Sequence, residues 1–461
     1  MALFNSVVDG LLAIPINESR QIGQAQRGHL REMLVDFYEG NQHGKDEYLK
    51  QFGFKDRDSL PFYSEPLTSR VVNEISLVYD VPPNRYIVDR NGAKLKQHGY
   101  YSFIEDYPFF DFAMQTIERY FNLLDNVLLR IAFDPSANRL RFFVETDYIP
   151  HFEPGNPLYP VAYSIVVKED YNEKVKQYQP VYLYVDQHQF FYHDEYGAKL
   201  TGDEYPSGDH DYGVVPVVDY SVYPVSEYWG IGRKPLVEAN RLLNIMELTR
   251  FYGIQYQSFD QLFATGMSIE DAGNLRVGPD EIMVNESIEG KFGKIGFSPQ
   301  IIESEQAMER WLSRTLDHYG LTATFREEGN VFSGVALRVK RQRLLRKHRK
   351  DVVFYRYKES EVFERLSAMI RVHPELGIKT WQDVRMISEF PEPQFPVSFT
   401  EIKEEWEWKV SKHLKTWQDY LMQENHSLTF EQATEILAKN RERNGGVGSA
   451  DSVESADSAE G

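Results

Sequence analysis

The chain has 461 residues, with 51 lysines and arginines against 70 aspartates and glutamates, and it contains no cysteine. This length corresponds to about three domains of roughly 150 residues, and 42% apolar against 26% charged residues is typical of soluble globular proteins. The missing cysteine excludes disulfide scaffolds, cysteine-ligated zinc, iron–sulfur clusters and thiol nucleophiles. The formal net charge of −19 argues against a protein that coats DNA or an anionic membrane.

The first residues show no export signal. The apolar run 7–16 is interrupted by Asp9 and Pro15 and follows no basic residue. No stretch approaches the ~20 apolar residues that a membrane span needs. We therefore expect a protein that is made in the cytoplasm and has no membrane partner.

The first 130 residues have mostly helical patterns. Apolar residues recur at helical spacing over 24–38 and over 68–79, and Pro82-Pro83 would stop the second of these helices. The region 112–129 predicts a third helix that passes into a strand at 127–133.

From about 140 to 225 the pattern changes to short β-branched and aromatic runs separated by turn clusters. This spacing predicts an antiparallel β-meander. The runs are 141–144, 161–167, 181–185 and 190–193.

Helical patterns return in the second half. Pro235 suits the first turn of a helix that extends to about residue 263, and a second helix is expected over 301–319. Between them, the glycine-punctuated segment 264–300 predicts a small α/β insert with strand-like pieces at 281–284 and 294–297.

The longest predicted helix covers 335–373, which has neither Gly nor Pro and would reach roughly 58 Å if unbroken. Residues 402–440 predict a compact helical unit in which Thr429 caps a helix with Gln432 three residues later. Residues 444–461 have the composition of a disordered acidic tail. The predicted fold class is α+β.

The usual signatures of catalysis or cofactor binding are missing. Gly230-Ile231-Gly232 lacks the third glycine of a dinucleotide fingerprint, and Gly290 to Lys294 lacks the spacing of a phosphate loop. Asp209-His210-Asp211 and the pair His188 and His193 are the best metal candidates, but neighbouring strand residues point to opposite faces. We expect no catalytic residue, no metal and no cofactor.

One segment is strongly basic: between 338 and 350 there are eight cations and no acid. Two interpretations stay open, a solvated or salt-bridged helix, and cations that face phosphates or acids of an adjacent subunit. The cations occupy nearly every side of the helix, which fits packing between subunits at least as well as a stripe that faces DNA. They are Arg338, Lys340, Arg341, Arg343, Arg346, Lys347, Arg349 and Lys350.

The segment before it, 321–334, is a glycine-containing polar loop. Phe325 and Phe332 in this loop are either anchors in a core or tips that contact a ligand. Sequence alone leaves both interpretations open.

Four segments in this order resemble the portal proteins of tailed bacteriophages, of the siphophage head-to-tail connector type. They are Phe37-Tyr38-Glu39-Gly40-Asn41, the stretch 67–79 followed by Pro82-Pro83, Ser333-Gly334-Val335-Ala336-Leu337-Arg338, and 406–437. The Pro-rich stretch 390–396 has no counterpart that we can place.

The resemblance implies a portal fold that runs through the whole chain in a fixed order. The implied parts are a wing (1–231), a stem helix (232–263), a clip (264–300), a second stem helix (301–320), a tunnel loop (321–334), a long helix with the completion of the wing (335–398), a crown (399–443) and the acidic tail (444–461).

The resemblance also implies a function without catalysis. A portal is a ring of twelve subunits at one capsid vertex of the virion, assembled in the host cytoplasm, through which double-stranded DNA is packaged and ejected. Implied partners are other copies of the chain, double-stranded DNA, the terminase motor, the capsid or scaffold protein and a head–tail adaptor. Tunnel-loop residues expected at the constriction are Phe325, Arg326, Asn330 and Phe332, and we expect acids to dominate the channel wall.

Two alternatives remain at this point. One is a soluble nucleic-acid-processing enzyme that grips its substrate with the basic helix 338–350. The other is a different head–tail connector ring, which would lack the stem-and-clip plan.

Overall fold

The computed structural model describes most of the chain and divides it into two compact units, residues 1–325 with 341–393, and residues 326–340 with 394–461. Among the described residues, no helix has the length and apolarity to cross a bilayer. The described residues are 18–41, 64–107, 109–156, 158–172, 176–221, 228–257, 261–265, 283–285, 292–295, 301–321, 342–378, 381, 383–393, 399–425 and 428–444.

Three amino-terminal helices pack together: α2 (Glu18–Glu39), α4 (Leu67–Ile75) and α6 (Phe109–Leu124). Their apolar faces meet in one cluster that contains Leu34, Val71 and Leu123. The sequence therefore located all three helices correctly.

The predicted end of α4 was wrong, because the helix stops at Ile75 and not at residue 79. The carboxylate of Glu118 on α6 accepts hydrogen bonds from the backbone N–H groups of Val78 and Tyr79, each at 2.8 Å. The side chain of Glu118 thus takes the place of the backbone carbonyls that these two N–H groups would bond in a longer helix.

A three-stranded antiparallel sheet has the order β3-β2-β9. Both α6 and α11 (Gln342–Val372) pack against it. The meander predicted from residue 140 was wrong on one point, since β3 forms a hairpin with β2. The strands are β2 (Asn126–Asp134), β3 (Arg139–Glu145) and β9 (Val217–Ser221).

The other three predicted strands, β5, β6 and β7, form the expected meander, and β4 and β8, which the sequence did not indicate, extend it to a five-stranded antiparallel sheet in sequential order. One face packs in a cluster with Leu128 of β2 and Tyr228. The strands are β4 (Tyr148–Phe152), β5 (Pro160–Asn172), β6 (Gln177–Val185), β7 (Gln189–His193) and β8 (Gly208–Asp209).

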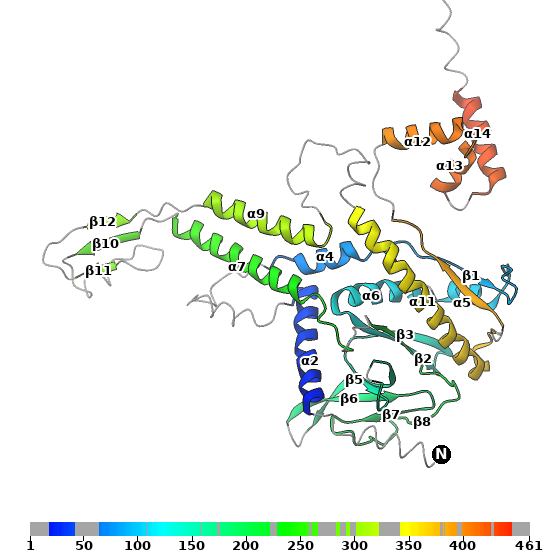
Figure 1. The fold of residues 1–461 in the computed structure, drawn as a ribbon, viewed down its shortest axis with the longest axis horizontal. Coiled ribbons are helices and arrows are strands. Elements are labelled where there is room, and N and C mark those ends of the chain that lie inside the picture. The colour runs from blue at the N-terminus through cyan, green and yellow to red at the C-terminus, as the bar shows by residue number, and fades with distance from the viewer. Residues whose placement is uncertain are drawn as a thin grey trace, which may run out of the picture. The chain divides into compact units, whose positions relative to one another are not determined.

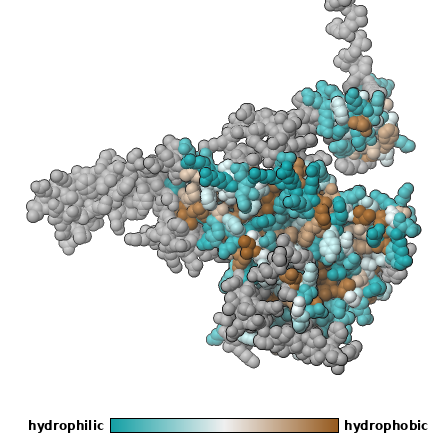
Figure 2. Space-filling view, viewed as in Figure 1, coloured by the Kyte–Doolittle hydropathy of each residue, from teal (hydrophilic) through white to brown (hydrophobic). Residues whose placement is uncertain are grey.

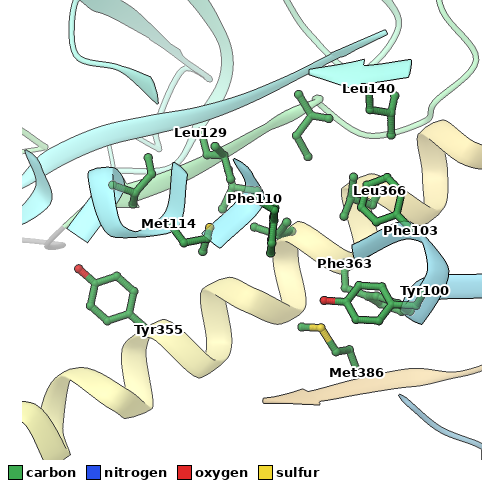
Figure 3. Packing of buried hydrophobic residues seen from close by; sticks show 14 of the residues in the cluster. Tyr100, Phe103, Phe110, Met114, Leu129, Leu140, Tyr355, Phe363, Leu366 and Met386 are labelled. Atoms are coloured by element: carbon green, nitrogen blue, oxygen red, sulfur yellow. The ribbon is translucent and has the colours of Figure 1, made fainter. Parts of the chain in front are cut away.

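The largest core lies where α11 crosses the body of the unit (Figure 1). Figure 3 shows Phe363 and Leu366 of α11 facing Tyr100 and Phe103 of α5, with Met386 of β13 beside them. The strands β1 and β13 pair antiparallel although about 300 residues separate them in sequence. The bounds are α5 (Gly99–Asp106), β1 (Asn84–Val88), β13 (Arg385–Glu389) and the 3₁₀-helix η1 (Pro374–Leu376).

The helices α7 (Lys234–Gln257) and α9 (Ile301–His318) contact each other along their length, as Figure 1 also shows. The prediction that the first helix reaches residue 263 was wrong. Residues 261–265 form strand β10 (Gln261–Thr265), which pairs with β11 (Met283–Asn285) and β12 (Phe292–Ile295). Pairing with segments 20 to 34 residues away overrides the local helical pattern.

The second unit contains three helices in the described residues: α12 (Phe399–Ser411), α13 (Trp417–Glu424) and α14 (Phe430–Asn444). The expected cap is confirmed, because the amide of Gln432 donates to the hydroxyl of Thr429 and the amide of Thr429 donates back to the side chain of Gln432.

Candidate nucleic-acid interface

The basic segment lies on α11, whose 31 residues span about 46 Å. Five of its eight cations are described: Arg343, Arg346, Lys347, Arg349 and Lys350. The other three, Arg338, Lys340 and Arg341, lie outside the described residues, as do the tunnel-loop candidates Phe325, Arg326, Asn330 and Phe332.

Two of the described cations connect α11 to other segments of the first unit. Arg343 donates to the backbone carbonyl of Asp317 at 3.2 Å, at the C-terminal end of α9, where a cation complements the helix dipole. Arg349 forms an ion pair with Glu392 at 2.9 Å, and both side chains are exposed.

Lys347 is directed into the body of the unit. Its Nζ donates to the side-chain oxygen of Asn122 at 3.0 Å and forms an ion pair with Asp351. It also acts on Glu118, the buried carboxyl that accepts the two amides after α4. Burial raises the pKa of Glu118 to about 7, while the two amide hydrogen bonds and the charge of Lys347 oppose this rise.

His348 adds no charge to this surface at neutral pH. Its side chain is buried, and burial lowers its pKa below the usual 6.5. Leu344, one turn earlier, is buried in the cluster shared with α9. This side of α11 therefore supports the fold and is not available to a ligand.

Two cations, Arg346 and Lys350, are exposed and form no ion pair or hydrogen bond with any described residue. At 3.6 residues per turn they lie within about 60° of Val353, Tyr357 and Glu364 on the helix circumference. Val353 is 66% exposed and Tyr357 is 60% exposed. We call these five residues the α11 stripe. It is basic at one end, apolar in the middle and acidic at the other end.

A buried ionic network fixes the orientation of α11. Arg85 of β1 donates two hydrogen bonds to Glu359 of α11, at 2.8 and 2.7 Å, and one to Asp111 of α6 at 2.7 Å. The hydroxyl of Tyr79 donates to the same Glu359 at 2.9 Å. Because Glu359 is fully buried, these contacts determine which face of α11 remains at the surface.

One arrangement resembles a catalytic relay. His373 lies between Glu375 (2.8 Å from Nδ1) and the hydroxyl of Tyr212 (2.7 Å from Nε2). Burial raises the pKa of Tyr212 to about 12, and the charge of Glu375 adds to the shift. A nucleophile or general base would need the opposite shift, so this chain of contacts acts as a structural link.

The metal candidates do not come together. Among the described residues there is no cluster of three or more potential metal ligands. The ring of His210 stacks on Tyr212 with centroids 4.4 Å apart. Nε2 of His193 lies 2.8 Å from the hydroxyl of Ser164, which in turn lies 2.8 Å from Nε2 of His151.

The sequence did not reveal the α11 stripe or the partner of Lys347. The eight cations were visible as a composition, but their directions depend on Glu118, Asn122 and Glu392, which are remote in sequence. The only signal for the stripe was the helical recurrence of Arg346, Lys350, Val353 and Tyr357, which could be recognised once the buried face was known.

No family model matches the sequence, and no curated protein matches it. The structure is similar at TM-score 0.35 and 12% identity to a chain in the neck of an empty gene transfer agent particle computed with C6 symmetry, covering 77% of this chain and 88% of that one. It is similar at TM-score 0.37 and 13% identity to a chain in the virion of a native gene transfer agent particle, covering 80% and 92%. At TM-scores below 0.5 these similarities establish neither a family nor a function.

Proposed function

We propose that this chain is a portal protein, a subunit of the ring through which double-stranded DNA enters and leaves a phage capsid. The proposal rests on the order of the elements that follow strand β9 along the chain. A contacting helix pair, α7 and α9, has a three-stranded sheet inserted between its members, and a long helix follows. This order supports a stem, a clip and a wing helix.

The division of the basic segment supports a ring more than a DNA-gripping enzyme. Arg343, Lys347 and Arg349 have partners within the chain, which leaves Arg346 and Lys350 as the described cations available to a partner. Two phosphate contacts would give weak binding with only a modest dependence on salt. Weak contact suits a channel in which DNA slides, and the proposed role, which involves no catalysis, requires no tighter DNA binding.

Electron microscopy of the purified protein tests the proposal. We expect rings of about twelve copies with a central channel, built from 53.8 kDa subunits. Particles of one or two copies in every buffer would contradict the proposal.

A double variant tests the enzyme alternative. If the helix grips nucleic acid, the wild type binds DNA tightly and replacing both Arg346 and Lys350 by Gln abolishes this binding, whereas the portal interpretation expects only weak DNA binding by the wild type itself. Removing residues 325–332 is expected to leave rings intact and to impair DNA packaging or retention. Normal packaging by that deletion would remove the tunnel-loop residues from the proposal.

A further inference from the structure

A cleft of about 890 Å³ lies along strand β13 in the first unit. Its walls are α11, the residues 383–387 of β13 and the turn before it, and the segment 212–214 between β8 and β9. The rings of Phe363 and Trp381, which stack on each other, belong to its lining. We call this surface the β13 cleft.

One edge of β13 has backbone groups without partners. In the pairing of β1 with β13, Ile87 lies opposite Met386. The carbonyl of Ile87 accepts from the amide of Leu95 at 2.8 Å, and the amide of Ile87 donates to the hydroxyl of Tyr101 at 3.0 Å. Both groups of Ile87 therefore point away from β13. Because opposed residues of an antiparallel pair either exchange both bonds or make neither, the amide and carbonyl of Met386 point away from β1, and they have no hydrogen-bond partner among the described residues.

This free edge is fixed in position and bounded at one end. The side chain of Met386 is buried in the core beside Phe363, as Figure 3 shows, so its backbone is held in place. Nε of Arg356 donates to the carbonyl of Ser388 at 3.2 Å, which closes the edge two residues further on. Open N–H and C=O groups at a sheet edge are a template for a further strand.

Two acids line the β13 cleft, and each has a cation nearby. Asp383 forms an ion pair with Arg90. Glu364 lies 3.8 Å from Arg365. The negative charges of the cleft are therefore at least partly neutralised within the chain.

Two cations of the β13 cleft have no acid as a partner. Arg371 is exposed and donates to the neutral carbonyl of Tyr212 at 3.1 Å. Arg385 is exposed and forms no ion pair or hydrogen bond with any residue that the structure describes. The charge that remains for an occupant to neutralise is positive, so an acidic occupant is complementary to this cleft.

The backbone groups decide which acidic molecule fits. Phosphates of a nucleic acid would match Arg371 and Arg385, but they offer no donor to the carbonyl of Met386. A peptide strand supplies both a donor and an acceptor at the spacing of the free edge.

We propose that the β13 cleft binds an extended acidic segment of another protein, which adds to β13 as a third strand. Its main chain bonds the amide and carbonyl of Met386, and its carboxylates pair with Arg371 and Arg385. Apolar side chains of the segment lie against Phe363. Since successive side chains of a strand point to opposite faces, acidic and apolar residues alternate in this segment. The contact is independent of the proposed portal function.

Fluorescence anisotropy with the full-length protein tests the proposal. The probe is a short fluorescein-labelled peptide in which valine alternates with glutamate, and we expect it to bind. The matched control peptides are the same sequence with all its amides N-methylated and a version with lysine in place of glutamate, and neither is expected to bind. Absence of binding by the acidic peptide, or equal binding of the N-methylated one, would overturn the proposal.

Charge reversal provides a second test that leaves the backbone edge intact. Arg385→Glu is expected to weaken binding of the acidic peptide roughly fivefold and to allow the lysine peptide to bind. Arg139→Glu is the matched control, because Arg139 is likewise an exposed first residue of a strand, β3. An equal loss in the two variants, or no gain for the lysine peptide with Arg385→Glu, would contradict the contact.

The outcomes separate this contact from the portal ring. Rings that bind no acidic peptide would overturn the contact and leave the portal proposal standing. Peptide binding by particles of one or two copies would support the contact and contradict the portal proposal. Binding by dissociated subunits that is lost on assembly would show that a second copy occupies the β13 cleft, and would overturn the proposal of a separate partner.

Discussion

The two units of this chain are stabilised in different ways. In the first unit, α11 is held by a fully buried ionic network around Glu359 and by an extended aromatic and aliphatic core. In the second unit, among the described side chains, only Trp406 and Ala433 are buried. Trp408, Leu414 and Phe430 are exposed there, and Figure 2 shows hydrophobic residues among hydrophilic ones on the surface of this unit.

The first unit depends on its buried core, whereas the second unit depends on contacts at the ends of its helices. The short helices of the second unit rely on capping boxes at Thr416 and Thr429 and on i,i+4 ion pairs such as Lys409 with Glu405. Such local contacts each contribute little, and a small unit buries a smaller fraction of its surface than a large one does. Local contacts at helix ends therefore matter more to the second unit than to the first.

The largest expected effect is on the buried network of the first unit. Arg85→Met leaves Glu359 buried without its partner and is expected to lower the free energy of unfolding by about 3–5 kcal/mol. Denaturant unfolding measures this. Arg90→Met is the matched control, because Arg90 and Asp383 pair on the surface and their loss should hardly matter. Equal effects of the two substitutions would contradict the importance of the network.

The second prediction concerns acid. Burial, with a smaller effect of His193, lowers the pKa of His151 to about 4 from the 6.5 of the unfolded chain. The stabilisation by neutral His151 is thus complete above pH 6.5 and is lost as the pH falls toward 4. The full effect is about 3 kcal/mol.

Glu118 acts in the opposite direction, because its pKa is raised to about 7 and its buried proton stabilises the fold as the pH falls. The prediction therefore concerns the difference in the free energy of unfolding between a variant and the wild type, followed as the pH falls. His151→Gln keeps a donor for Ser164 and removes the titration, so it should become more stable relative to the wild type from pH 7 to pH 5. His29→Gln, at an exposed position on α2, is the control, and parallel curves for all three proteins would contradict the assignment.

A smaller effect is expected in the second unit. Thr429→Ala removes the acceptor for the amide of Gln432 and should destabilise α14 by about 1 kcal/mol. Hydrogen exchange is expected to accelerate in α14 and to stay unchanged in α6 and α11. Acceleration throughout the chain would show that the two units unfold together.

An effect of similar size distinguishes the two kinds of cation on α11. Lys347→Met removes the contacts with Asn122 and Asp351 and should cost about 1 kcal/mol, whereas Lys350→Met should leave the free energy of unfolding unchanged. Thermal unfolding of the two variants side by side provides the measurement. A larger loss from Lys350→Met would mean that the directions of the two side chains are reversed.

Much of the local structure could be predicted from the sequence, because α9 has clear helical spacing with identifiable ends, α14 has a recognisable cap, and α2 was found although its start was placed six residues late. The predictions that failed did so where distant residues intervene. Glu118 ends α4 early by accepting the amides of Val78 and Tyr79, and strand pairing converts 261–265 from helix to sheet.

The sequence shows the cluster of cations in the candidate site, but it does not show which of them lie together at the surface. Periodicity identifies α11 as a helix, yet only the partners of Lys347 and Arg349 show that Arg346 and Lys350 alone, among the described cations of the segment, are free. The cleft between α5, α6, β3 and η1 depends on β3 leaving the meander to pair with β2, which no local pattern indicated.

The central claim is that the chain acts as a closed ring of copies. The native mass of the full-length protein in solution tests it most directly. The account predicts a single species close to twelve times 53.8 kDa. A wild-type mass of one or two subunits at micromolar concentration would contradict it.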